Sequence, residues 1–101
     1  MKSQDLLDDD HLSQGARVLQ ALAHPLRLGI MQALAEAPLT CSELQQRMGC
    51  PQPTLSLQLK VLVDQGLVST CKEGTVKRCS IRNRDFLKMF VCLRRHLSEV
   101  L

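Results

Sequence analysis

The stretch that most constrains this chain is residues 51–66, Pro-Gln-Pro-Thr-Leu-Ser-Leu-Gln-Leu-Lys-Val-Leu-Val-Asp-Gln-Gly. Leu55, Leu59 and Leu62 recur at i, i+4 and i+7, which places them on one side of a helix. The side chains that flank this stripe or point outward are amides, hydroxyls and one cation: Gln52, Thr54, Ser56, Gln58 and Lys60. Such groups bind base edges and phosphates in a major groove. An ordinary amphipathic surface helix is the alternative, and this stretch alone does not separate the two.

Length and composition indicate a single, mainly helical domain. The chain has 101 residues, enough for one core without metal or disulfide staples. There are two Phe, no Tyr and no Trp, which favours stacked helices over a large β-sandwich. No run approaches the roughly eighteen apolar residues of a membrane span, and no basic-then-apolar leader is present. We therefore expect a cytoplasmic protein whose five cysteines, none in a Cys-x-x-Cys pair, are reduced thiols.

Charge is unevenly distributed along the chain. The formal net charge is +3, but residues 1–10 hold one lysine against four aspartates, a sum of −3, so the remaining residues sum to +6. Residues 71–95 contain eight Lys or Arg against two acidic residues. Such a basic block is either a footprint for a polyanion or a solubilising face. We expect residues 1–8 to be a flexible acidic N-terminus and residues 9–101 to form the domain.

Three helices are expected before residue 51. The first begins after the aspartates at 8–10, which favour a helix N-terminus, and runs to about residue 22. The second begins at Pro25, where a missing N–H is not needed. The third begins at Thr40, because Thr40-Cys-Ser-Glu43 matches the capping box. Its short glycine-containing connection to the next helix, Gly49-Cys-Pro51, matches the helix-turn-helix pattern.

Two short strands follow, at residues 67–71 and 76–81. They alternate in polarity around a predicted two-residue loop at Glu73-Gly74. Lys72 and Lys77 would stand near the tip, where they can reach a phosphate. The apolar face of the hairpin would consist of Val68, Cys79 and Ile81. A lone two-stranded hairpin is not stable, so we expect this one to pack against the helices.

The last helix is expected from about Arg84 to the C-terminus. Its apolar stripe extends over four turns and consists of Phe86, Met89, Phe90, Leu93, Leu97 and Val100. A terminal helix this apolar, in a chain that already has a core, is expected to pack against another subunit. We therefore predict a two-fold homodimer formed through the first and last helices.

The expected fold is mainly α with a small β-hairpin, in the order helix, helix, helix-turn-helix, hairpin, long helix. The segments that carry a resemblance are Leu19-Gln-Ala-Leu-Ala-His-Pro-Leu-Arg-Leu-Gly-Ile-Met31, Leu44-Gln-Gln-Arg-Met-Gly49, Gln52-Pro-Thr-Leu-Ser56, Leu59-Lys-Val-Leu62, Gly66-Leu-Val68 and Glu73-Gly74. Over roughly residues 15–101 the chain resembles the ArsR/SmtB family of bacterial repressors, which are winged helix-turn-helix proteins. The resemblance implies a homodimer that binds a palindromic DNA operator and is released by an inducer.

The resemblance also implies a set of DNA contacts. The family contacts fall on Gln52, Thr54, Ser56, Leu57 and Gln58. Lys60, Lys72 and Lys77 join them as candidate phosphate ligands. Leu57 stands where the family commonly has His, so a thymine-methyl contact is available but a polar base contact is not. Pro51 replaces the usual Ser and removes a side-chain cap, so we expect an altered operator preference with binding retained.

Two inducer patterns of the family are absent from this sequence. The arsenic and cadmium pattern Cys-x-Cys-Asp-Leu corresponds to residues 40–44, where hydroxyls occupy both ligand positions and Cys41 falls between them. The paired cysteines of the persulfide-sensing branch would fall at Gln32 and near Ser98, and neither stretch offers a thiol.

A zinc-type pattern on the last helix is partly present. The family ligands would fall on Asn83, Asp85, His96 and Glu99. Independently, a helical spacing of about 100° per residue places four candidate ligands within an arc of about 60°: Asp85, Cys92, His96 and Glu99. Spacings of i, i+3 and i, i+4 allow neighbours to share a zinc-like or softer ion. The alternative is a polar flank on a dimer helix with a packed cysteine.

Cys41 and Cys50 form a second candidate site. Cys41 lies in the first turn of the third helix, where the helix dipole favours a thiolate, and Cys50 lies in the exposed turn that follows. Oxidation, or a thiophilic metalloid such as arsenite bridging the two thiols, would distort the helix-turn-helix. The expected cofactor is thus a zinc-like or thiophilic metal ion, or none with thiol oxidation in its place.

The predicted function is a dimeric, sequence-specific DNA-binding repressor that a thiol-reactive or metal inducer releases. The alternative is a winged-helix protein-interaction module without an inducer site, against which the basic wing and the neutral amide face of residues 52–60 argue. An enzyme is not expected, because the chain has no Gly-rich phosphate loop, nucleophile–base pair or carboxylate dyad.

Overall fold

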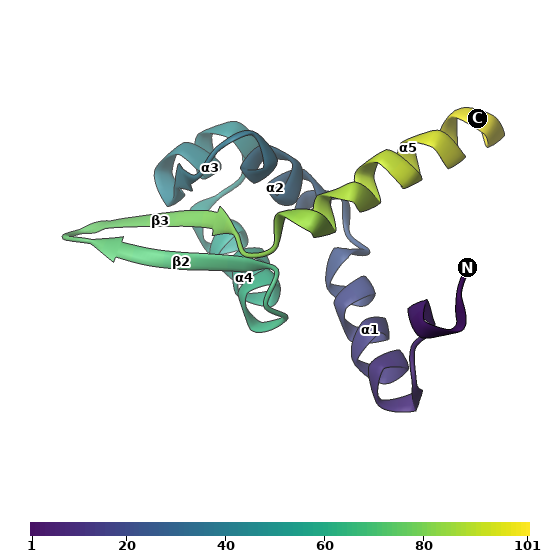
Figure 1. Cartoon of the computed structure of the whole chain (residues 1–101). Coiled ribbons are helices and arrows are strands. Elements are labelled where there is room, and N and C mark those ends of the chain that lie inside the picture. The colour runs from purple at the N-terminus through teal and green to yellow at the C-terminus, as the bar shows by residue number, and fades with distance from the viewer.

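The computed structural model describes residues 1–101 and has the predicted winged helix-turn-helix architecture (Figure 1). Its elements are η1 (Ser3–Asp5), α1 (Asp9–Leu22), α2 (Pro25–Glu36), β1 (Leu39–Thr40), α3 (Cys41–Met48), α4 (Gln52–Asp64), β2 (Val68–Glu73), β3 (Val76–Ile81), η2 (Arg84–Leu87) and α5 (Lys88–Val100). The helices α2, α3 and α4 form a body from which the β2–β3 hairpin projects to one side and α1 and α5 to the other (Figure 1). None of the helices combines the length and hydrophobicity that a membrane span requires.

The core is wholly apolar and is centred on the predicted stripe of α4. Leu55, Leu59 and Leu62 are 2%, 3% and 0% exposed. They belong to a cluster of 13 buried residues, to which α2 contributes Ile30 and Leu34, and no polar or charged residue is buried. Burial of this stripe fixes the rotation of α4 about its own axis, and Ser56, Leu57 and Lys60, which lie between its leucines, are exposed.

Side-chain caps stabilise the starts of α1 and α3, as the sequence predicts. The Asp8 carboxylate accepts a hydrogen bond of 2.9 Å from the His11 amide at the start of α1. At α3, the Glu43 amide donates to the Thr40 hydroxyl at 3.1 Å, and the Thr40 amide donates back to the Glu43 carboxylate at 2.9 Å. These hydrogen bonds hold the pKa of Glu43 below its usual value. The stabilisation from this carboxylate is therefore present near neutral pH and lost as the pH falls through that lowered pKa.

The hairpin register differs from the prediction. β2 and β3 pair so that Glu73 lies opposite Val76, which makes Gly74-Thr75 the two-residue loop in place of the predicted Glu73-Gly74. Gly74 has φ 65°, and a two-residue hairpin loop with one positive φ needs glycine at its first central position. Each β2 residue therefore pairs with a β3 residue two positions later than predicted. Because side chains alternate between the two faces of a strand, this shift leaves Val68, Cys79 and Ile81 on one face.

A third strand, β1, is absent from the predicted fold. It pairs antiparallel with β3, with Leu39 opposite Cys79 and Thr40 opposite Arg78, and the strand order is β1-β3-β2. Two residues are too few to show the alternation that signals a strand in a sequence. This strand joins the hairpin to the helical body directly before α3.

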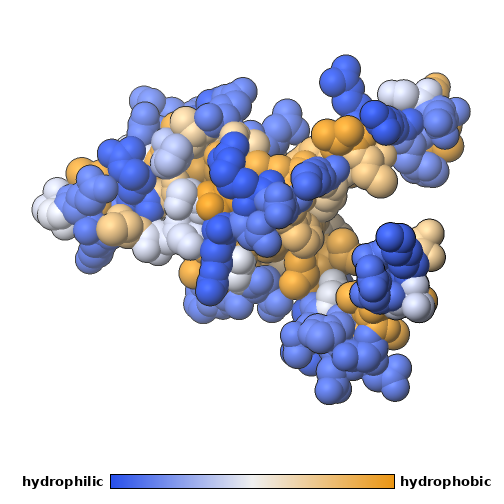
Figure 2. All heavy atoms as spheres, viewed as in Figure 1, coloured by the Kyte–Doolittle hydropathy of each residue, from blue (hydrophilic) through white to orange (hydrophobic).

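The two terminal arms carry apolar side chains that this chain does not bury. The expected last helix opens as the 3-10 turn η2, and Phe86 and Phe90 pack partly against the core. Farther along α5, Leu93 and Leu97 are 38% and 41% exposed, and Leu19 of α1 is also exposed. The radius of gyration is 15.0 Å, against about 13 Å for a compact domain of this length. Hydrophobic surface lies along α5 and in the recess between α5 and α1 (Figure 2).

Replacing Thr40 with Ala tests the cap of α3. The substitution removes the hydroxyl that satisfies the Glu43 amide, so we expect the free energy of unfolding to fall by about 1 kcal/mol in urea titrations. The matched control is Ser42→Ala, at an exposed position two residues along the chain. Its free energy of unfolding should stay within about 0.5 kcal/mol of the wild-type value. Equal losses in the two variants would contradict the capping role.

Candidate nucleic-acid interface

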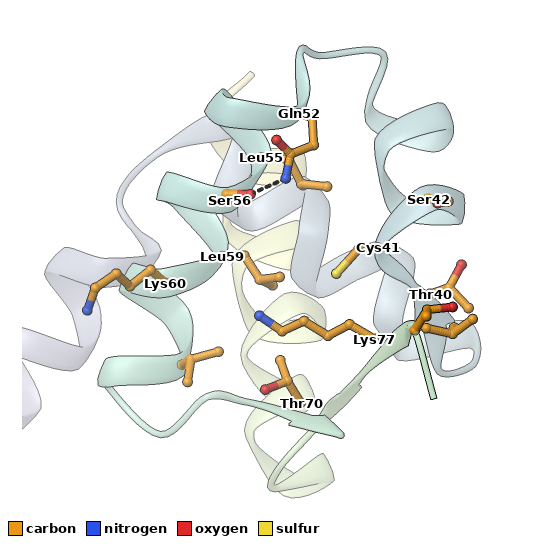
Figure 3. A pocket seen from close by; sticks show the side chains of 13 residues that line it. Thr40, Cys41, Ser42, Gln52, Leu55, Ser56, Leu59, Lys60, Thr70 and Lys77 are labelled. Atoms are coloured by element: carbon orange, nitrogen blue, oxygen red, sulfur yellow. Dashed lines mark hydrogen bonds between the residues drawn. The ribbon is translucent and has the colours of Figure 1, made fainter. Parts of the chain in front are cut away.

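A cavity of about 850 Å³ separates α4 from the hairpin (Figure 3). It is lined from α4 by Gln52, Ser56 and Lys60, from β3 by Lys77, and at its inner end by Cys41 of α3. In Figure 3 the Lys77 side chain reaches across the cavity towards α4. The structure thus brings together four of the predicted DNA-binding residues from two elements, in one concave and partly basic surface.

The outer face of α4 keeps the polar character that the sequence indicates. The Gln52 side-chain amide donates a hydrogen bond of 2.7 Å to the Ser56 hydroxyl, one helical turn along, and Thr54 is exposed beside them. The Lys60 ammonium pairs with Asp64 at 2.8 Å, an exposed ion pair that contributes little stability. Leu57 is 62% exposed, so this face also presents one apolar side chain with no contact to the core.

Gln58 differs from its predicted outward-facing neighbours. It is only half-exposed, and its side-chain oxygen accepts a hydrogen bond of 2.7 Å from the Arg27 guanidinium. Arg27 also donates to the backbone carbonyls of Gln20 and Ala21, so Gln58 ties α4 to the junction of α1 and α2. Its NH₂ group keeps two donors for an outside partner. Arg27 is not among the residues predicted for this site. In the sequence it stands out only as a single charged residue among apolar residues at the start of α2.

The hairpin places two lysines directly opposite each other. Lys72 and Lys77 are cross-strand partners, and neither forms an ion pair with a carboxylate. The nearby Glu73 pairs instead with Arg78, at 3.5 Å. Like charges directly opposite each other destabilise a strand pair, and an anion bound between them would offset that repulsion. The arrangement favours a phosphate ligand at the hairpin.

The structure brings together two of the four predicted metal ligands. Cys92 and His96 line one hollow of about 480 Å³ between α5 and α1. Glu99 lines a different hollow, and Asp85 lies on η2 beside Lys88, at 3.6 Å. The 3-10 turn breaks the 100° spacing on which the prediction for Asp85 depends. No three His, Cys, Asp or Glu side chains lie together as a metal site within this chain.

Cys41 has a thiol neighbour that the sequence did not predict. The Cys41 sulfur lies 3.7 Å from the sulfur of Cys79, which is fully buried on β3, as its predicted place in the core requires. Cys50 is half-buried against the core, Cys71 and Cys92 are exposed, and none of the five forms a disulfide. The sequence gives no sign of the Cys41–Cys79 contact, because it depends on the pairing of β1 with β3.

Comparisons with known proteins agree with this architecture. A helix-turn-helix domain family matches residues 22–71. The biofilm growth-associated repressor of Xylella fastidiosa is 46% identical over 55 residues, which are 54% of this chain and 48% of that protein. The probable mercury resistance operon repressor of Streptomyces lividans is 35% identical over 86 residues, 82% of this chain and 69% of that protein. The chain therefore spans about half the length of the Xylella relative.

Solved structures also match nearly the whole chain, and one of them is described as homodimeric. It is the solution structure of a homodimeric winged helix-turn-helix DNA-binding domain from Mycobacterium bovis, a possible ArsR-family transcriptional regulator. Its TM-score is 0.80 at 30% identity, and the match covers 94% of this chain and 91% of that one. Fold and surface thus define a winged helix-turn-helix protein. The chain belongs to the ArsR/SmtB family of transcriptional regulators.

Replacing Lys72 with Thr tests the repulsion at the hairpin. Removal of one of two opposed charges should leave the free energy of unfolding unchanged or raise it by up to about 0.5 kcal/mol at low salt, with the gain lost as salt screens the pair. Arg78→Thr is the control, because it removes a cation that pairs with Glu73 and should lower stability. A clear loss of stability in Lys72→Thr would show that this lysine holds the hairpin together.

Proposed function

We propose that the protein is a homodimeric, sequence-specific DNA-binding repressor whose operator affinity an inducer lowers. The observation that carries this proposal is the juxtaposition of the polar face of α4 with Lys77 of the hairpin across one cavity, with Lys72 directly opposite Lys77 on the neighbouring strand. α4 is a helix of 13 residues whose opposite side is buried, so its exposed side can enter a major groove lengthwise.

The known relatives support a DNA-binding regulator. Two of them are named as repressors, and the homodimeric Mycobacterium bovis structure is described as a DNA-binding domain. We infer the same class of function for this chain. The proposed roles follow the chemistry of each side chain: Gln52, Thr54, Ser56 and the free NH₂ of Gln58 contact base edges, Leu57 contacts a thymine methyl, and Lys60, Lys72 and Lys77 contact phosphates.

A second copy of the chain is the proposed partner of the two arms. Leu19 on α1 and Leu93 on α5 are exposed and line the recess between these helices, and Leu97, one turn farther along α5, is exposed beside a second hollow next to α2. A two-fold axis through this surface buries the same apolar patch on both subunits. It also presents two copies of α4, as a palindromic operator with half-sites about 34 Å apart requires.

The inducer is proposed to be a metal ion or a thiol-reactive compound. The Streptomyces lividans relative is named as a probable mercury resistance operon repressor. In this chain Cys92 and His96 share a hollow at the proposed subunit seam, where side chains of a second copy can complete a coordination shell that Asp85 and Glu99 do not complete within one chain. Cys41 and Cys50 stay the alternative predicted pair.

DNA binding tests the proposed roles directly. Ser56→Ala should cost about 1–3 kcal/mol on the operator and little on random duplex, because it removes a base contact. Lys77→Ala should weaken binding to all sequences and reduce the salt slope by about 1, because it removes a phosphate contact. Ser69→Ala on β2, exposed and outside the cavity, is the control. Fluorescence anisotropy at two salt concentrations measures all three, and salt-independent binding would favour the protein-interaction module.

Two leucine-to-glutamate substitutions, one on α5 and one on α4, test dimer formation and DNA binding separately. Leu97→Glu should yield a monomer in analytical ultracentrifugation, because it buries a carboxylate in the proposed subunit contact. Leu57→Glu, the same substitution on α4, should leave the dimer intact and abolish DNA binding through repulsion of phosphates. A dimer that survives Leu97→Glu would exclude α5 from the interface.

A further inference from the structure

Arg27 is a half-buried arginine in the first turn of α2 that contacts the end of one helix and the side of another. Its Nε donates to the Ala21 carbonyl at 2.5 Å and its Nη2 to the Gln20 carbonyl at 3.3 Å, both in the last turn of α1. Its Nη1 donates to the side-chain oxygen of Gln58 on α4, at 2.7 Å. Two backbone carbonyls therefore hold the guanidinium in place, and the Gln58 side chain adapts to it.

We propose that Arg27 is a positioning residue that holds Gln58 as a hydrogen-bond donor to DNA, and that Gln58 consequently prefers guanine to adenine. The proposal rests on the proposed function, because it concerns a base contact made by α4. It adds a residue outside the predicted DNA-binding set, which acts through Gln58 and not on the DNA directly.

The chemistry of the two side chains fixes the orientation of the Gln58 amide. An arginine has five N–H donors and no acceptor. The amide atom that faces Arg27 therefore has to be the oxygen, because the opposite orientation would place an NH₂ group against a cation. A hydrogen bond from a charged donor is also stronger than one between neutral groups. Gln58 thus has one stable amide orientation, unlike a glutamine that only water surrounds.

The nitrogen of the same amide has no partner within the chain. It forms no hydrogen bond, and no buried side-chain nitrogen or oxygen is left without one, so solvent reaches the NH₂ group. Gln58 follows the exposed Thr54 by one helical turn and adjoins Leu57, which is 62% exposed. The side chain therefore borders the outer face of α4 and offers a partner two N–H donors.

A side chain that only donates distinguishes the bases differently from an ordinary glutamine. A free glutamine binds adenine through two bonds, because its oxygen accepts from N6 and its nitrogen donates to N7. With the oxygen held by Arg27, only the bond to N7 remains. Guanine presents two acceptors, O6 and N7, which one nitrogen can reach together, as a lysine does. Thymine presents one acceptor and cytosine a donor, so we expect guanine to bind best and cytosine worst.

The charge behind the amide acts in the same direction. Arg27 forms no ion pair with a carboxylate, so its positive charge is not neutralised within the chain. A cation bonded to the oxygen polarises the amide and makes its NH₂ group a better donor. The cation also repels the amino group of an adenine that approaches the same oxygen. Both effects favour a base that presents acceptors alone.

Binding-site selection from randomised duplexes, made with the full chain, tests this preference. The base pair that Gln58 contacts is the one at which Gln58→Ala loses selectivity. At that position the wild type should bind guanine better than adenine by about 5-fold or more in anisotropy titrations with single-base operator variants. Arg27→Met removes the donors that hold the oxygen, so the preference for guanine should disappear and adenine should bind at least as well.

Two further variants separate the base preference from a general structural effect. Gln58→Glu keeps an oxygen for Arg27 but replaces the outward donors with an acceptor, so its preference should move from guanine to cytosine, whose N4 donates. Arg84→Met is the matched control. Arg84 also donates to a backbone carbonyl near a helix end, that of Ala35 at 2.8 Å, but forms no hydrogen bond to α4, so the preference for guanine should stay. Circular dichroism shows whether each variant is folded.

The proposal is overturned if Gln58→Ala alters selectivity at no position, if the wild type binds adenine as well as guanine there, or if folded Arg27→Met keeps the preference for guanine. A double-mutant cycle of unfolding free energies for Arg27→Met and Gln58→Ala tests the contact without DNA, and zero coupling would exclude the positioning role. If the wild type binds no DNA sequence selectively, the proposed function fails and the base preference with it, whereas the cycle still decides whether Arg27 holds Gln58.

Discussion

The burial of three leucines on one side of α4 is the interaction on which the rest of this structure depends. Full burial of a leucine side chain is worth about 1.5–3 kcal/mol, so Leu55, Leu59 and Leu62 together contribute several kcal/mol. A helix cap contributes about 1 kcal/mol and an exposed ion pair less. No surface interaction of α4 can therefore compete with its core contacts in setting the rotation of the helix, and its polar face is held outward.

The surfaces proposed to bind DNA and a second subunit carry features that lower the stability of the isolated chain. Lys72 and Lys77 repel each other across the hairpin, Pro51 leaves the start of α4 without a side-chain cap, and leucines on both arms contact water. Each of these features costs stability in the isolated chain. Phosphates offset the first, and a second subunit offsets the last, so the same features that weaken the monomer favour the proposed complex.

The chain places Cys92 and the Cys41–Cys79 pair in two separate regions of the structure. Cys92 and His96 face α1 in the recess between the arms, whereas Cys41 and Cys79 lie where α3 meets the hairpin. In the proposed dimer, a ligand bound in the recess would act on DNA binding through the relative position of the two subunits.

The sequence by itself determined the helices, their caps and the inner face of α4, because these depend on residues three or four positions apart, such as Thr40 with Glu43. It also predicted which elements carry the candidate DNA contacts. Only the tertiary structure decided that Gln58 binds Arg27, that β1 joins the sheet, and that Cys41 lies beside Cys79. These contacts join residues 31 to 40 positions apart, and no local periodicity encodes such distances.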